Sequence, residues 1–145
     1  MQNILFFDDD SFATNYLIQN LKDNYGWKGD KEITFVSTSD ELLNEIIKNA
    51  DSYDLFVLDV IAGIPSNTPN NFFSAKDRNK MADGYSLGLV MAEKIRKVKK
   101  NVPILYLSGG LTLPIPDSER GFTTFIKKPV SPEELSKEMN RLLGI

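Results

Sequence analysis

The chain has 145 residues, 41% hydrophobic and 26% charged, which is the composition of one ordinary globular domain. It contains neither cysteine nor histidine, so disulfides, thiolate or imidazole metal ligands and nucleophile–histidine pairs are excluded, and any chemistry must use carboxylates, hydroxyls, lysine or a bound cation. The net charge of −3 gives no overall field for nucleic acid, and no run reaches the roughly 20 apolar residues of a membrane span, so we expect a cytoplasmic protein.

The first half of the chain predicts two strands, each followed by an amphipathic helix. The strands are expected over 3–7 and 32–36, and the first is continuously apolar, as in a strand covered on both faces. The apolar stripe of the first helix is expected to comprise Phe12, Ala13, Tyr16, Leu17 and Leu21. The second helix begins with the capping-box spacing of Thr38 and Glu41, and its stripe comprises Leu42, Leu43, Ile46 and Ile47.

The second half predicts three further strands, over 55–60, 102–108 and 123–128, and two further helices. Asp83 is the expected N-cap of the earlier helix, whose stripe comprises Leu87, Met91, Ile95 and Val98. The last helix begins with Ser131 as cap and Pro132 at its first position, and its stripe comprises Leu135, Met139, Leu142 and Leu143.

Two segments interrupt this alternation. Residues 62–80 are too polar and too rich in Pro and Asn for a regular element, and they are longer than most connections in compact domains. Within 109–121, Pro114 and Pro116 cannot both lie inside a helix, so any helix there is short or displaced.

The alternation predicts a single α/β domain over 1–145, with a central parallel sheet and right-handed crossovers. Ligands of such sheets bind beyond the carboxyl ends of the strands. Polar groups follow four of the predicted strands here: Asp8, Asp9 and Asp10 after the first, Asp59 at the third, Ser108 at the fourth, and Lys127 and Lys128 at the fifth. With a strand order of 2-1-3-4-5 these four strands are neighbours, and the polar groups meet in one crevice.

Carboxylates that share a pocket cannot all stay ionised without a cation, and oxygen ligands alone favour Mg²⁺. A metal held by carboxylates, with a lysine and a hydroxyl opposite, suits the neutralisation of phosphoryl oxygens in a transfer reaction. Each feature alone also fits an ordinary turn or helix cap. The combination is more specific, because four features fall on four strand ends in the required order.

With these motifs the chain resembles the receiver domain of two-component response regulators over essentially its whole length. Asp8 and Asp9 in "FFDDD" match the acidic pair of that family, and Asp59 in "LFVLDV" matches its phosphoacceptor. Ser108 in "YLSGG" matches the switch hydroxyl, and Lys128 in "FIKKP" matches the lysine of the Lys-Pro pair. The resemblance implies a flavodoxin-like (CheY-like), doubly wound sheet of five parallel strands in the order 2-1-3-4-5.

The resemblance also implies a mechanism and partners. Asp8, Asp9, Asp59 and the backbone carbonyl of Ile61 would bind Mg²⁺, and Asp59 would accept a phosphoryl group from a phosphohistidine of a histidine kinase or histidine phosphotransfer protein. Lys128 would offset the growing charge, while the switch residues Ser108 and Phe125 would change conformation. The chain would then be a stand-alone signalling domain, not an enzyme with a separate substrate, and it would bind neither nucleic acid nor membrane.

Two departures from the family pattern leave alternatives open. The loop after Asp59 is longer than usual and carries Phe72 and Phe73, which fits either a surface insertion or a lid or docking element beside the acceptor. The proline-containing segment replaces the fourth helix, part of the family's usual output surface, which puts switching through that helix in doubt. Phe125 fits a switch aromatic and a plain core residue equally well.

Two other functions remain as alternatives. "FFDDDS" also resembles the Asp-x-Asp motif of haloacid dehalogenase-like Mg²⁺ phosphatases, with Asp8 as nucleophile and Asp10 as acid/base. Motif order argues against that class, because its last acidic motif follows the lysine, whereas Asp59 precedes Ser108. The third reading is a receiver-like interaction module that is not phosphorylated.

Overall fold

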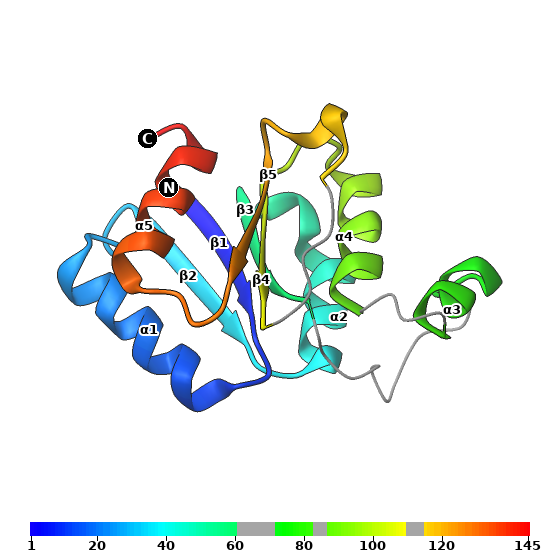
Figure 1. Ribbon diagram of the computed structural model, residues 1–145, viewed down its shortest axis with the longest axis horizontal. Helices are drawn as coiled ribbons and strands as arrows, with labels where there is room; N and C mark the ends of the chain where they lie inside the picture. Colours follow the sequence, from blue (N-terminus) through cyan, green and yellow to red (C-terminus); the bar gives the residue numbers. More distant parts are fainter. Residues whose placement is uncertain (61–71, 83–86, 110–114) are drawn as a thin grey trace.

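The computed structural model describes residues 1–60, 72–82, 87–109 and 115–145 (Figure 1). The strands are β1 (Gln2–Phe7), β2 (Lys31–Val36), β3 (Leu55–Asp59), β4 (Ile104–Ser108) and β5 (Thr123–Lys127). The helices are α1 (Ser11–Asn24), α2 (Ser39–Asn49), α3 (Ala75–Ala82), α4 (Leu87–Val98) and α5 (Pro132–Leu143), with short 3₁₀ helices η1 (Ala50–Ser52) and η2 (Asp117–Glu119). No helix in these four ranges is both long and apolar enough to cross a bilayer.

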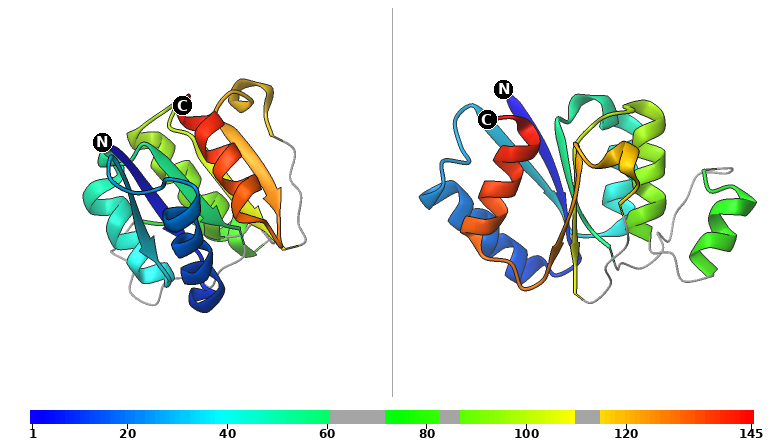
Figure 2. Two further views of the ribbon diagram at one scale, coloured as in Figure 1. Left: turned by 90° about the vertical axis from the view of Figure 1, so that its left-hand side faces the viewer. Right: turned by 45° about the horizontal axis from the view of Figure 1, so that its top comes forward.

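The five strands form one parallel sheet in the order β2-β1-β3-β4-β5, which confirms the predicted fold. The register of the three strands on this side of the sheet is shown by Ile4 of β1, which lies beside Ile33 of β2 and Leu55 of β3. Helices α1 and α5 cover one face of the sheet, and α2 and α4 cover the other (Figure 2). This arrangement accounts for the continuously apolar β1 and β3, because a strand between two helical layers buries both of its faces.

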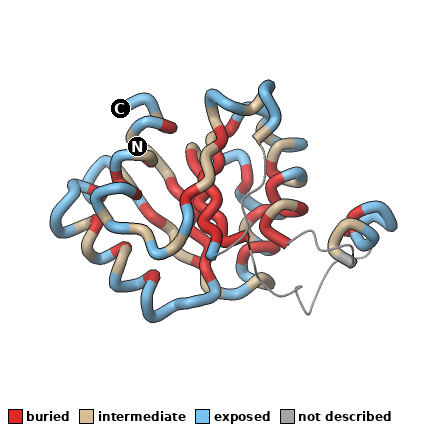
Figure 3. Tube along the Cα trace, in the orientation of Figure 1, coloured by how far each residue is buried: buried red, intermediate tan, exposed pale blue. Residues whose placement is uncertain are grey.

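Two hydrophobic cores lie on either side of the sheet, whose central strands are buried (Figure 3). Alternate residues of β1 divide between them, since Leu5 packs with the α2/α4 core and Phe6 with the α1/α5 core. The α1/α5 core also contains Trp27, which is fully buried and donates a hydrogen bond from Nε1 to Ser136 Oγ of α5 (2.8 Å). This bond holds the turn after α1 against α5.

The predicted buried face of α1 is confirmed for Leu17 and Leu21, which pack in or against the α1/α5 core, and is wrong for Phe12, Ala13 and Tyr16, which are exposed. Phe12 and Tyr16 are 89% and 73% exposed, and the buried residues of the helix are Thr14, Ile18 and Leu21. Both sets have helical spacing, but the buried one begins with a threonine. A count of apolar residues passes over that threonine and selects the adjacent face instead.

The remaining helices follow their predicted patterns more closely. The side chains of Thr38 and Ser131 accept hydrogen bonds from backbone amides three residues ahead (3.2 and 3.1 Å), which confirms both N-caps. Ile47 and Val98 lie at the ends of their stripes and are 48% and 58% exposed, so they add little to the core. The expected N-cap Asp83 falls outside the described residues.

The expectation that 62–80 contains no regular element is wrong, since α3 begins at Ala75. The Ser74 hydroxyl accepts a hydrogen bond from the Asp77 amide (3.1 Å), and the Asp77 carboxylate accepts one from the Ser74 amide (2.9 Å). This reciprocal capping starts a helix in a segment whose Pro and Asn content predicts none. By contrast, 115–121 contains only η2, as expected of a short or displaced element.

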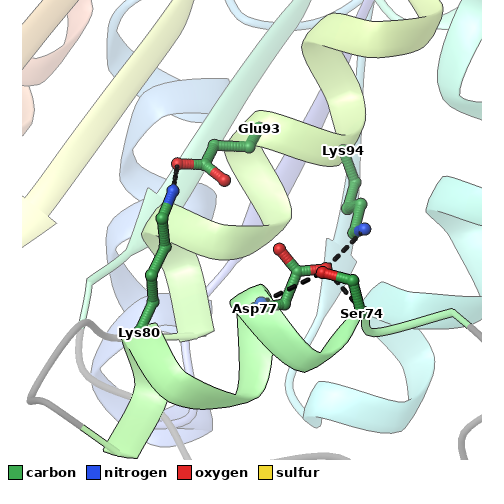
Figure 4. A network of polar contacts seen from close by, with 5 residues as sticks. All are labelled: Ser74, Asp77, Lys80, Glu93 and Lys94. Carbon is green, nitrogen blue, oxygen red and sulfur yellow. Dashed lines mark hydrogen bonds and ion pairs between the residues drawn. The ribbon is translucent and has the colours of Figure 1, made fainter.

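Helix α3 is fastened to α4 by two ion pairs (Figure 4). Lys94 Nζ lies 2.7 Å from Asp77 Oδ2, and Lys80 Nζ lies 2.6 Å from Glu93 Oε1. Phe73 is buried in the α2/α4 core, and Phe72 packs against that core with Lys94 over its ring. Both phenylalanines therefore attach the insertion to its own domain.

Candidate functional site

Four of the predicted site residues lie at the carboxyl ends of their strands, which form the lower edge of the sheet in Figure 1. Asp8 directly follows β1, Asp59 is the last residue of β3, and Ser108 is the last residue of β4. Lys128 directly follows β5, whose last residue Lys127 pairs with Ser108. The fold therefore brings together four groups that are as much as 120 residues apart in the chain.

Three carboxylates form the acidic part of the site. Asp8, Asp9 and Asp59 each offer one oxygen, and these oxygens lie within 4.8 Å of one another. Asp8 and Asp59 are only 3% and 4% exposed, whereas Asp9 faces solvent. Two buried carboxylates so close together repel each other and lose hydration, so positive charge is needed between them.

Lys128 supplies part of that charge. Its Nζ lies 2.8 Å from Asp8 Oδ2 and 3.6 Å from Asp59 Oδ2. Burial alone would lower the pKa of Lys128, but the hydrogen bond with Asp8 and the charges of both aspartates outweigh burial and raise the pKa above 10.5. Lys128 is therefore a fixed cation at neutral pH. The peptide bond that follows it, to Pro129, is cis.

Ser108 and Phe125 are placed differently from each other. Ser108 is 2% exposed at the end of β4, and its carbonyl accepts a hydrogen bond from the Lys128 amide (2.7 Å). Phe125 is half-buried in the middle of β5 and stacks on Tyr106, with ring centroids 4.7 Å apart. Ser108 thus borders the acidic cluster, and Phe125 packs on the α2/α4 side of the sheet. The predicted ligand Ile61 lies outside the described residues.

Asp10 caps a helix. Its Oδ1 accepts a hydrogen bond from the Ala13 amide (3.2 Å) at the first turn of α1, and its own amide donates to Asp8 Oδ1 (2.9 Å). The carboxylate of Asp10 therefore stabilises the start of α1, and its backbone orients Asp8. This separation of roles makes three consecutive aspartates tolerable.

Gly88, which was not predicted as a site residue, belongs to the support of Asp59. A Cβ at this position in the first turn of α4 would lie 2.5 Å from the backbone oxygen of Asp59 and 3.1 Å from Cα of Val60. The helix can approach the end of β3 this closely only because residue 88 has no side chain. A glycine near the start of a predicted helix was the available signal.

Among the comparisons with known proteins, only the comparison with solved structures gives matches. No protein-family profile matches the chain, and no curated protein does. Among solved structures, a receiver protein of Sinorhizobium medicae shares 22% identity at a TM-score of 0.66, over 99% of this chain and 94% of that one. A CheY-like receiver domain of Methanospirillum hungatei shares 19% at 0.65, also over 99% and 94%.

This chain has the receiver-domain fold. The receiver domain of the hybrid histidine kinase CckA extends the likeness, with 20% identity, a TM-score of 0.64 and coverage of 97% of this chain and 98% of that one. The match runs nearly end to end in both directions, so the resemblance expected from the motifs is confirmed for the fold. The acidic cluster lies at the carboxyl edge of this receiver fold, where ligands of doubly wound sheets bind.

Proposed function

We propose that this chain is a response-regulator receiver that accepts a phosphoryl group on Asp59. The observation that carries the proposal is the meeting of Asp8, Asp9 and Asp59 with Lys128 at one edge of a receiver fold. In a protein without histidine or cysteine, this is a complete set of charged groups for phosphoryl transfer.

The donor set fits Mg²⁺. Three carboxylate oxygens within 4.8 Å of one another form a hard, oxygen-only cluster, and one of them, on Asp9, is open to solvent and so leaves room for bound water. Asp8, Asp9 and Asp59 would hold the ion, together with the backbone carbonyl of Ile61. When bound, Mg²⁺ neutralises oxygens of the transferring phosphoryl group.

The residues of the chain divide the remaining work. An oxygen of Asp59 forms the new bond to phosphorus as the bond from phosphorus to the imidazole nitrogen of a phosphohistidine breaks. Lys128, fixed 3.6 Å from Asp59, balances the charge that gathers on the acceptor. The hydroxyl of Ser108 donates a hydrogen bond to an oxygen of the bound phosphoryl group, and the side chain of Phe125 changes its packing in response.

The proposed partners are a histidine kinase or a histidine phosphotransfer protein, in the cytoplasm. The protein acts in two-component signalling as a phosphoacceptor and not as an enzyme with a separate substrate, because Asp59 itself is modified. Its output is a change of shape that a downstream protein recognises.

Incubation with acetyl phosphate and Mg²⁺, followed by intact-mass and peptide mass spectrometry, tests this function. Wild type should gain the mass of one phosphoryl group on the peptide that contains Asp59. Asp59→Asn should gain none, and Asp30→Asn, which alters an exposed carboxyl before β2, should behave as wild type.

Each other result decides against the receiver function. Phosphate on the peptide that contains Asp8 supports the haloacid dehalogenase-like phosphatase. Equal labelling of Asp59→Asn and wild type refutes Asp59 as acceptor. No labelling of wild type, with acetyl phosphate or with a phosphohistidine protein, supports an interaction module that is not phosphorylated.

A further inference from the structure

A cavity of about 580 Å³ lies between α4, β4, β5 and η2, on the α2/α4 side of the sheet. Its walls reach from Phe125 to Pro116 beside η2, the gold segment above α4 in Figure 1. Neither Asp59 nor Lys128 lines it, so the cavity is separate from the acidic cluster, and Phe125 is the one proposed switch residue in its wall. Its volume is that of an ordinary small-molecule site.

One wall of the cavity is aromatic. Tyr106 of β4 and Phe125 of β5 stack with an interplanar angle of 24°, and both rings border the cavity. Ile115 and Pro116 add apolar surface. A flat aromatic molecule could extend this stack and replace water on an apolar wall.

The Tyr106 hydroxyl keeps some accessible surface in this cavity, although the rest of the residue is buried. The residue is 6% exposed, and its hydroxyl makes no hydrogen bond to any residue in the described part of the chain. Burial raises the pKa of Tyr106 to about 12, so the hydroxyl keeps its proton and remains a donor at neutral pH. An accessible hydroxyl without a protein partner beside an apolar wall is a candidate contact for a ligand oxygen.

Of the charged side chains that line the cavity, one lysine has no ion-pair partner among the described residues. Arg96 pairs with Glu119, and Glu93 pairs with Lys80 of α3. Lys97 also lines the cavity and makes no ion pair with the residues that the structure describes. An anionic group on a ligand would therefore find an uncompensated positive charge at the exposed rim.

We propose that this cavity binds a small aromatic carboxylate of one or two fused rings. The rings lie against Tyr106 and Phe125, a carboxylate oxygen accepts a hydrogen bond from the Tyr106 hydroxyl, and the charge of the carboxylate faces Lys97. The site goes beyond phosphoryl transfer and does not depend on it.

Titration of the full chain with 2-naphthoate, followed by saturation-transfer NMR and calorimetry, tests the proposal. We expect saturable binding of one molecule with a Kd of roughly 0.1–1 mM, the range of a good fragment-sized ligand. Tyr106→Phe, which keeps the ring stack, should weaken binding about 10-fold. Lys97→Gln should weaken it about 3-fold and reduce its salt dependence.

Matched controls distinguish binding in this cavity from nonspecific binding elsewhere on the protein. Tyr16→Phe removes an exposed tyrosine hydroxyl from α1 and should bind as wild type does. The affinity for the neutral 2-naphthalenemethanol should be lower than that for 2-naphthoate and should not change in Lys97→Gln.

Two results would overturn the proposal. One is the absence of saturable binding up to about 10 mM, beyond the range of useful fragment affinity, and the other is equal binding by Tyr106→Phe and wild type. If the Tyr106→Phe variant unfolds at a lower temperature than wild type, the comparison of 2-naphthoate binding by Lys97→Gln and wild type decides instead. Phosphorylation of Asp59 is scored separately, so each idea can fail alone.

Discussion

Three identical residues in a row, Asp8, Asp9 and Asp10, have three different environments. Asp8 is buried against Lys128, Asp9 faces solvent beside the same cluster, and Asp10 caps α1. The chain turns sharply after β1, so successive side chains point into the site, to its rim and onto the helix. Residue type alone fixes none of these roles, because each depends on which backbone amide or cation lies within about 3 Å.

Gly88→Ala tests the close contact behind the acceptor. An alanine within a helix ordinarily stabilises it by about 1 kcal/mol relative to glycine. Here the added Cβ would meet the Asp59 backbone oxygen at 2.5 Å, and neither backbone can yield without shifting. We expect a net loss of about 1–3 kcal/mol in the free energy of unfolding and slower labelling by acetyl phosphate.

The control for this substitution is Gly121→Ala. Residue 121 has no left-handed φ, and a Cβ there meets nothing within 4 Å. Its stability should stay within about 0.5 kcal/mol of wild type, and its labelling rate should not change. Denaturant unfolding followed by Trp27 fluorescence measures the stabilities. Equal stability of Gly88→Ala and wild type would show that α4 does not press on β3.

At this scale the sequence predicted that these polar residues lie together, but not the residues that pack behind them. Asp59, Ser108 and Lys128 could be found because strand ends of a parallel sheet share one edge, whatever the helices do. Gly88 could not, because its importance is a distance to Asp59 that no spacing in the sequence contains. The unpartnered Tyr106 hydroxyl likewise depends on packing between elements.

At the scale of elements, two helices differ from their prediction for opposite reasons. Helix α1 presents Phe12 and Tyr16 to solvent, although its apolar stripe suggested the reverse. Thr14 shares the buried face with Ile18 and Leu21, which pack with α5 in one core. Helix α3 forms in a polar segment, where reciprocal capping by Ser74 and ion pairs with α4 replace an apolar stripe.

The attachment of α3 should depend on pH through Asp77. Burial raises the pKa of Asp77, but the ion pair with Lys94 and the hydrogen bonds from Ser74 outweigh it and lower the pKa from 3.8 to about 2. The folded state therefore favours the carboxylate more than the unfolded chain does. The resulting stability is fully present above pH 3.8 and is lost as the pH falls through about 2.

Asp77→Asn should accordingly reduce the free energy of unfolding by about 1–2 kcal/mol at neutral pH, because the amide cannot form the ion pair with Lys94 that lowers the pKa of the carboxyl. The difference from wild type should shrink steadily between pH 4 and pH 2, the interval over which wild type loses the same contribution. Unfolding curves at several pH values measure it, with Asp30→Asn as the control. A difference that does not vary with pH would show that the loss comes from capping geometry alone.

At the scale of the molecule, the alternation of strand and helix predicted a parallel α/β sheet, and the strand order came from the resemblance to receiver domains. Continuous apolar strands, crossover helices and short connections leave few arrangements of five parallel strands. The long insertion and the segment around Pro114 were recognisable as departures. Helix α3 within the insertion was not predictable, because it rests on tertiary contacts such as Lys94 with Asp77, not on local periodicity.

Mg²⁺ should stabilise the folded protein, since its proposed ligands come from the ends of both β1 and β3 and the ion would link the two strands. At 100 times its Kd, the ion should add about 2.7 kcal/mol to the free energy of unfolding. Asp9→Asn removes an exposed ligand without disturbing a core, and it should lose most of this gain. Thermal unfolding with Mg²⁺ and with a chelator measures the effect. Equal gains in Asp9→Asn and wild type would place the ion elsewhere.

Both ends of the chain lie toward the upper edge of the sheet in Figure 1, opposite to the carboxyl ends of the strands that carry the acidic cluster. A fluorescent label, an affinity tag or a surface tether attached at either end would therefore sit a full strand length from Asp59. Such an immobilised chain presents its reactive edge outward, which suits capture of a transient phosphodonor from solution. Joining the protein to a second domain through either end should likewise leave the approach to the acceptor open.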